Sequence, residues 1–133
     1  MTDPAPPPSP LTVAEFEPLA ASRMDSAAWD YYAGGAGDER TIAENRVAWE
    51  RLHLRPRVLV DVSARDLATR VLGTELSHPV VVAPTAAHGF ADPEAERATA
   101  RGAAVAEALY TLSTISTVPM EEVAEAAPGA PRW

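Results

Sequence analysis

The spacing of apolar residues changes near residue 79 of this 133-residue chain. Before that point, residues 38–54 place apolar side chains at roughly helical spacing, namely Ile42, Val47, Trp49 and Leu52. After it, short β-branched runs alternate with alanine-rich stretches that favour helices. This order predicts an α/β chain with a helical N-terminal part and βα units in its C-terminal part.

Two helices are expected within residues 11–35. Thr12 and Glu15 fit a capping box that begins the first helix, and Pro18 keeps that helix short or kinked. The second helix is expected to begin at the Asp-Ser pair 25–26. It should stop at the glycine pair 34–35, where a left-handed residue is sterically inexpensive.

The next segments are a third helix and a less regular region. The stretch DERTIAENRVAWERLHL, residues 38–54, predicts a helix that Pro56 terminates. Residues 57–73 alternate imperfectly and predict extended or hairpin-like segments. At the other end, residues 1–10 contain five prolines and predict a polyproline or disordered arm.

The sequence PVVVAPTA, residues 79–86, predicts a short buried strand over 80–83. Pro84 lacks an N–H group and cannot continue a central ladder, so the chain must turn there. In α/β folds ligands bind at the carboxyl ends of such strands. A ligand site is therefore expected at this turn.

Two βα units follow from the pattern after residue 79. Asp92 and Pro93 are expected to be the N-cap and first residue of an alanine-rich helix. The run LYTLSTIS, 109–116, predicts a second strand, and Pro119 opens another helix, MEEVAEAA. A third strand is expected to begin at Trp133. Successive βα units imply parallel strands with right-handed crossovers.

Two parallel strands leave an open sheet edge and a half-covered apolar face. Either the N-terminal helical part caps this small sheet or the remaining strands come from elsewhere, and we favour the second. The expected organisation is an arm over residues 1–10, helices and a hairpin over 11–78, and two βα units of an incomplete barrel over 79–133.

Composition excludes several partners. The net charge of −8 and the pI of about 4.8 argue against nucleic acid, which requires basic patches. The chain has no cysteine, hence no disulfide, thiolate nucleophile or Cys-ligated metal. No apolar run approaches 18 residues, and no signal-peptide pattern is present, so neither a membrane nor export is expected. A cytoplasmic location is the expectation.

Six segments together resemble the family of FMN-dependent 2-hydroxy-acid oxidases and dehydrogenases, which includes glycolate oxidase, lactate oxidase, mandelate dehydrogenase and hydroxymandelate oxidase. They are YYAGGAGDERTIAENRVAWERL, RPRVLVDVS, VLG, PVVVAPTA, DPEAERATARGAA and YTLSTISTVPMEEVA. The resemblance runs from about residue 11 to 133 and covers the first third of a family member. It implies the N-terminal part of a (β/α)8 TIM barrel: a helical segment, a small hairpin and the first two βα units.

The resemblance implies FMN as cofactor and assigns residues to it. Pro84, Thr85 and Ala86 match the turn whose backbone lies against the flavin, with a backbone N–H near flavin N5 and a small side chain at Ala86. Ser113 matches a hydroxyl position that contacts the flavin ring. An ordinary strand-ending turn and a satisfied core hydroxyl are the structural alternatives.

The resemblance also implies a small 2-hydroxy acid as substrate. Tyr31 matches the tyrosine that hydrogen-bonds the substrate carboxylate, and an aromatic that merely anchors its helix is the alternative. Ile115 stands where glycolate oxidase-like members carry a bulky pocket aromatic, so glycolate is in doubt and a larger, aryl side chain is favoured. His88 follows the turn and histidine is a common general base, but His88 does not match the family's base and is interpreted as loop structure.

The family's catalytic histidine, carboxylate-binding arginine, flavin-side lysine and phosphate loops fall outside the matched third, so no catalytic residue is assigned in this chain. Oxidation of (S)-2-hydroxy acids to 2-oxo acids is expected only together with a complementary C-terminal barrel polypeptide, in an assembly that by resemblance is a homo-oligomer such as a tetramer. A non-catalytic truncated remnant or interaction module is the alternative.

Overall fold

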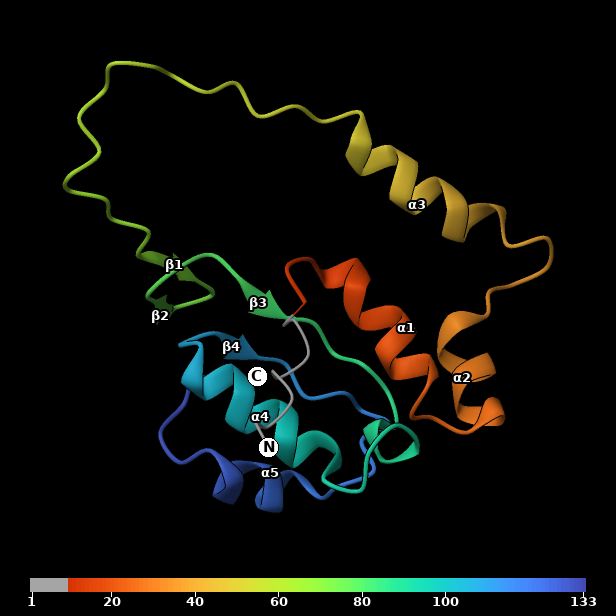
Figure 1. Cartoon of the computed structure of the whole chain (residues 1–133). Helices are drawn as coiled ribbons and strands as arrows, with labels where there is room; N and C mark the ends of the chain where they lie inside the picture. The colour runs from red at the N-terminus through yellow and green to blue at the C-terminus, as the bar shows by residue number, and fades with distance from the viewer. Residues whose placement is uncertain (1–9) are drawn as a thin grey trace, which may run out of the picture.

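The computed structural model describes residues 10–133, so nearly all of the expected proline-rich arm lies outside the described residues. The helices, in chain order, are the 3-10 turn η1 (Val13–Glu15), α1 (Phe16–Ala21), α2 (Ser26–Ala33), α3 (Arg40–Glu50), the 3-10 turn η2 (His88–Phe90), α4 (Ala95–Val105) and α5 (Met120–Ala126). The strands are β1 (Thr69–Val71), β2 (Thr74–Leu76), β3 (Val81–Val82) and β4 (Leu109–Tyr110). Figure 1 shows the strands above α4 and α5, with α1 and α2 to one side.

The first two helices form where the sequence places them, but their ends differ in detail. The Thr12 side chain makes no cap bond, and Glu15 Oε2 instead accepts from Leu11 N–H at 2.7 Å, so the predicted capping box is wrong. Asp25 does cap α2, accepting from Ala28 N–H at 2.9 Å. The helix stops at Gly34, although Gly34 is extended (φ −76°) rather than left-handed.

Helix α3 is shorter than the predicted 38–54. It begins after Glu39, whose backbone is left-handed (φ 56°), and it ends at Glu50. In Figure 1, α3 and the irregular chain that follows it arch away from the other elements. An ion pair between Arg46 and Glu17, 2.9 Å apart, links α3 to α1.

The predicted hairpin is confirmed within residues 69–76. Strands β1 and β2 pair antiparallel, with Thr69 opposite Leu76. The two-residue turn at Leu72 and Gly73 has φ of 47° and 84°, as a type I′ turn requires. Residues 57–68, by contrast, form no strand.

The C-terminal half is a small parallel sheet. Val81 pairs with Leu109 and Val82 with Tyr110, so β3 and β4 run parallel. A third parallel segment lies on the other side of β4, where Arg132 pairs with Tyr110. An isolated parallel bridge therefore forms one residue before the predicted start of the third strand, and β4 lies between β3 and this segment.

Both strands of the parallel sheet are shorter than predicted, and the helix after Asp92 begins later than predicted. The Ser113 hydroxyl accepts from Ile115 N–H at 3.1 Å, which turns the chain out of the sheet and ends β4 before the predicted residue 116. Asp92 does accept from Glu94 N–H at 2.7 Å, in the manner of an N-cap. The regular helix nevertheless begins only at Ala95, because the left-handed backbone there (φ 48°) separates this turn from α4.

The core lies between the sheet and the two C-terminal helices. Helix α4 packs against β4 and α5 through small side chains, which let the elements approach closely. The cluster comprises Ala95, Ala100, Ala103, Ala108, Tyr110, Val118, Val123 and Ala127. This core fixes the carboxyl ends of β3 and β4, from which the loops of the site emerge.

Candidate functional site

Two loops follow β3 and β4 at the carboxyl end of the sheet, and they are hydrogen-bonded to each other. Ala87 N–H donates to Ile115 O at 2.9 Å. Gly89 N–H donates to Thr117 Oγ1 at 3.0 Å. A Cβ on Gly89 would lie 2.8 Å from that oxygen, so the approach requires glycine. The turn and residue 115 are therefore held at a fixed separation.

A buried carboxylate joins these loops to α4. Glu96 is 0% exposed; its Oε1 accepts from His88 N–H at 3.1 Å and from Thr117 N–H at 3.0 Å. Its Oε2 accepts from the Thr117 hydroxyl at 2.7 Å. Burial raises the pKa of Glu96, but the hydrogen bonds from Thr117 and His88 outweigh it and lower the pKa to about 2. Glu96 is thus a satisfied, ionised carboxylate at neutral pH.

The tyrosine pair of α2 approaches the same loop. The Tyr32 hydroxyl donates to Ala87 O at 2.6 Å and lies 3.1 Å from Ala86 O. Burial, followed by the proximity of Tyr31 and Glu96, raises the pKa of Tyr32. Tyr31 itself is 54% exposed, and its ring stacks edge-on with Tyr32 and Phe90. Tyr32 therefore anchors α2, and Tyr31 is left with a hydroxyl that bonds nothing in residues 10–133.

Replacing Tyr32 by phenylalanine is expected to lower the free energy of unfolding by about 1–2 kcal/mol, because the part-buried Ala87 carbonyl loses its donor. Tyr31→Phe is the matched control on the same helix and should change the unfolding free energy by less than about 0.5 kcal/mol. Urea unfolding followed by circular dichroism measures both. Equal losses in the two variants would contradict the anchoring role of Tyr32.

The predicted flavin-side residues lie on these loops. Pro84 and Thr85 are exposed and Ala86 is half-buried. Within residues 10–133, the N–H groups of Thr85 and Ala86 donate to no other group, whereas the next N–H, at Ala87, is engaged. Ser113 is half-buried and its oxygen already accepts from Ile115 N–H. The turn therefore presents free donors, and the Ser113 hydroxyl can still donate.

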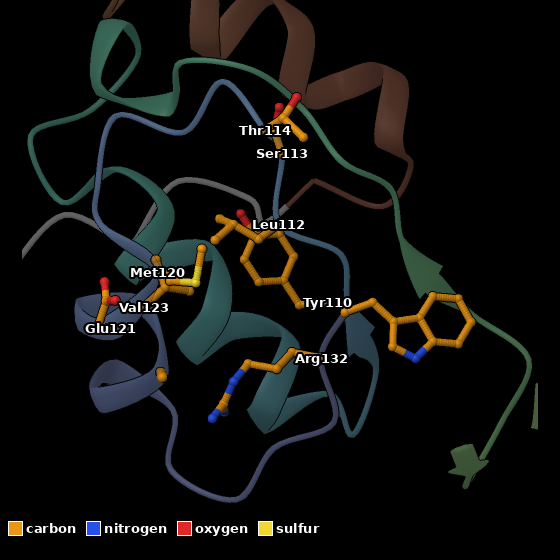
Figure 2. A pocket seen from close by; sticks show the side chains of 10 residues that line it. Tyr110, Leu112, Ser113, Thr114, Met120, Glu121, Val123 and Arg132 are labelled. Atoms are coloured by element: carbon orange, nitrogen blue, oxygen red, sulfur yellow. The ribbon is translucent and has the colours of Figure 1, made fainter. Parts of the chain in front are cut away.

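Three hollows separate the predicted residues. Ser113 lines an apolar hollow of about 460 Å³ between β4 and α5, where Tyr110, Leu112, Met120 and Val123 converge (Figure 2). Tyr31 lines a second, of about 480 Å³, with Phe90. Ser113, Tyr31 and Thr85 each line a different hollow. No other predicted cofactor or substrate residue lines any of these three hollows. Ile115 is 66% exposed and lines none of the three.

His88 is held by the fold. Its Nδ1 lies 3.0 Å from Thr99 Oγ1 on α4, and its ring lines a hollow of about 900 Å³ with Tyr32 and Thr85. In the described part of the chain, no three His, Cys, Asp or Glu side chains gather as a metal site would require. No helix of residues 10–133 is long and apolar enough to cross a membrane.

Sequence reasoning missed the residues that hold the loops together. Glu96, Thr117 and Tyr32 carry no motif of their own, and their partners lie up to 55 residues away in the chain. The sequence held one weak indication for Glu96. It is an acidic residue at the start of a helix whose other packing residues are alanines, and acidic residues are rarely buried.

Residues 20–133 match the family described as FMN-dependent dehydrogenase. The chain belongs to this family. Glycolate oxidase 1 of Zea mays is 49% identical over 117 residues, which cover 88% of this chain and 32% of the relative. Glycolate oxidase of Spinacia oleracea is 46% identical over the same shares. The chain spans about a third of the length of these relatives.

Solved structures agree with the fold. A lactate oxidase of Pediococcus acidilactici superposes with a TM-score of 0.86 at 35% identity, over 93% of this chain and 34% of that one. A mandelate oxidase also gives 0.86, at 34% identity, over 94% and 36%. The expected fold, the N-terminal part of a (β/α)8 barrel, is confirmed. FMN is the cofactor of this 2-hydroxy-acid oxidase family.

Proposed function

We propose that this chain forms the N-terminal part of an FMN-dependent enzyme that oxidises (S)-2-hydroxy acids to 2-oxo acids. A C-terminal part carrying the remaining barrel strands completes it. The observation that carries the proposal is the exposed turn at residues 84–86, which has free N–H donors and is fixed to the loop bearing Ile115. The family match and the names of the relatives supply the reaction class.

The geometry of the turn suits one edge of a flavin. The N–H groups of Thr85 and Ala86, which have no partner in residues 10–133, would hold the acceptor edge of the oxidised flavin ring by hydrogen bonds. Ala86 carries only a methyl group, so a planar ring can lie against the backbone. Ser113 Oγ accepts from Ile115 N–H through one of its lone pairs, so its proton would be free to donate to the ring. FMN, when bound, supplies the two-electron acceptor for the carbon that bears the hydroxyl.

On the substrate side, this chain supplies binding and orientation. The exposed Tyr31 hydroxyl has no competing partner within residues 10–133 and donates to the substrate carboxylate. A charge-assisted hydrogen bond of this kind contributes about 1.5–3 kcal/mol. Ile115 is exposed on the second loop and, in the completed site, would leave space for a larger substrate side chain than an aromatic would.

The open side of the sheet supports completion by a further polypeptide segment. The Tyr110 hydroxyl is buried and has no hydrogen-bond partner in the described residues, which costs about 1–3 kcal/mol. The Tyr110 side chain also lines the apolar hollow beside Met120 and Val123 (Figure 2). A following βα unit packed there would fill the hollow.

A chimera tests the proposal. Residues 1–133 are joined to the C-terminal two thirds of Zea mays glycolate oxidase 1, the part that the match leaves uncovered. We expect the purified chimera to carry FMN and to release hydrogen peroxide from at least one of glycolate, lactate and mandelate. A folded chimera that holds no flavin and oxidises none of the three acids would contradict the proposal.

Tyr31→Phe in the same chimera separates substrate binding from folding. We expect KM for the hydroxy acid to rise about 10- to 100-fold, which corresponds to the loss of one charge-assisted hydrogen bond. Flavin content should stay unchanged, since Tyr31 lies on the substrate side. An unchanged KM would assign the carboxylate to another residue and leave Tyr31 as a helix aromatic.

A further inference from the structure

The two loops of the proposed site meet through a polar network and not through apolar packing. The loop after β3 contributes the N–H groups of Ala87, His88 and Gly89; the loop after β4 contributes Ile115 O and Thr117. Every bond of this network except the one from Ala87 to Ile115 ends on Glu96 or on the Thr117 hydroxyl that Glu96 holds. Glu96 therefore holds the two loops together alongside the direct bond from Ala87 to Ile115.

A fully buried carboxylate such as that of Glu96 is unusual between two loops. It is the one charged side chain that is fully buried among the described residues. A buried carboxylate is tolerated only when hydrogen bonds compensate for lost hydration, and here two backbone N–H groups and one hydroxyl do so. An apolar residue would fill the same volume more cheaply, but it would leave these donors unpaired.

The same carboxylate connects the loops to a rigid element. Glu96 lies in the first turn of α4, whose core face packs against β4 and α5. A negative charge is favoured there by the helix dipole. Movement of the loops relative to the barrel wall is thus restrained by a helix and not only by contacts between the loops themselves.

We infer that Glu96 is a positioning residue for the site: it fixes the flavin-side turn at 84–86 and Ile115 on the substrate side at the separation that the reaction requires. The inference rests on the proposed function. Glu96 touches neither proposed ligand; it acts through His88 N–H on one loop and Thr117 on the other. Misplacement of reacting groups by about 1 Å lowers rates by up to about 100-fold, so the loss of this link should be visible in turnover.

Amide exchange in the chain alone tests the link without flavin or substrate. In the wild type, the amides of Ala87, His88, Gly89 and Thr117 should be protected to a degree similar to Thr111 in the sheet. In Glu96→Gln and Glu96→Leu, their protection should fall at least about tenfold relative to Thr111, with the larger loss in Glu96→Leu. Glu122→Gln, at an exposed ion pair on α5, is the matched control and should leave all five amides unchanged.

Turnover in the chimera tests the consequence for the site. We expect kcat per bound flavin to fall about tenfold in Glu96→Gln and further in Glu96→Leu, with a change in the flavin absorption spectrum. Thr117→Val should reproduce the loss, and Thr117→Ser should recover most of it, because serine keeps the hydroxyl that links Gly89 to Glu96. Dividing by bound flavin removes any effect of lower stability or poorer loading.

The outcomes are distinct. If kcat per bound flavin stays within twofold of the wild type while the melting temperature falls, Glu96 only stabilises the fold and the inference is overturned. If the wild-type chimera carries no flavin, the proposed function fails on its own. The amide-exchange result then decides the link separately: retained protection in Glu96→Gln and Glu96→Leu would show that the loops do not depend on this carboxylate.

Discussion

Acidification from about pH 5 to about pH 2 is expected to remove about 3 kcal/mol of unfolding free energy through Glu96 alone. The folded-state pKa is about 2, against 4.5 for an unperturbed glutamate. A carboxylate whose pKa is lower in the folded state stabilises that state at pH values above its unfolded-state pKa. This contribution is lost as the pH falls through the folded-state pKa. A difference of about 2.5 units corresponds to about 3 kcal/mol.

The groups that face Glu96 do not titrate in this interval. Tyr32 and Tyr110 have raised pKa values and stay neutral in acid, and His88 and Thr117 present a backbone N–H and a hydroxyl. Urea unfolding of the wild type and of Glu96→Gln, repeated at several pH values, isolates the contribution. The gap between the two stabilities should close toward pH 2. A gap of constant size would show that Glu96 has an ordinary pKa in the folded chain.

Leu109→Ala is expected to lower the unfolding free energy by about 3 kcal/mol. Leu109 is 0% exposed in the central strand β4, and shortening a fully buried leucine removes apolar contacts and leaves a cavity. Successive strand residues point to opposite faces, so Leu109 lies across the sheet from Tyr110 and the alanine-rich cluster. The substitution therefore probes a part of the interior separate from α4 and α5.

Leu54→Ala is the matched control, because Leu54 is 98% exposed and the same atoms are removed from solvent-facing chain. It should change stability by less than about 0.5 kcal/mol. Both variants are compared with the wild type by urea unfolding at neutral pH. A loss below about 1 kcal/mol for Leu109→Ala would mean that the face of the sheet opposite α4 relaxes freely and is not a packed interior.

The parts of the fold set by local sequence were predictable. Pro84 ends β3 early, Asp25 caps α2, Gly73 allows the type I′ turn, and the alanine pattern of α4 packs on the sheet as expected. Each of these depends on residues within a few positions of one another. Element ends were less predictable, since left-handed backbone at Glu39 and Ala95 shortens two helices whose composition would allow them to be longer.

The candidate site was predictable in position but not in construction. The strand end at residue 84 and the chain turn after it followed from local chemistry, and the roles of Tyr31, Ser113 and Ile115 were assigned through the resemblance. The contacts that hold these residues are long-range: Tyr32 to Ala87, Gly89 to Thr117, and Glu96 to both loops. The spacing of apolar and polar side chains along the sequence does not indicate which distant backbone groups will donate hydrogen bonds to a buried carboxylate.

The close approach of Gly89 to Thr117 has a consequence for how this site can vary. A Cβ at position 89 would lie 2.8 Å from Thr117 Oγ1 and 3.2 Å from its Cβ, and threonine is β-branched, with little freedom to turn aside. Any larger residue at 89 would therefore displace the Thr117 hydroxyl, which is one of the donors to Glu96. Residues 89, 96 and 117 can therefore be substituted only together. A variant library that randomises the three positions independently would consist almost entirely of proteins with a disrupted site.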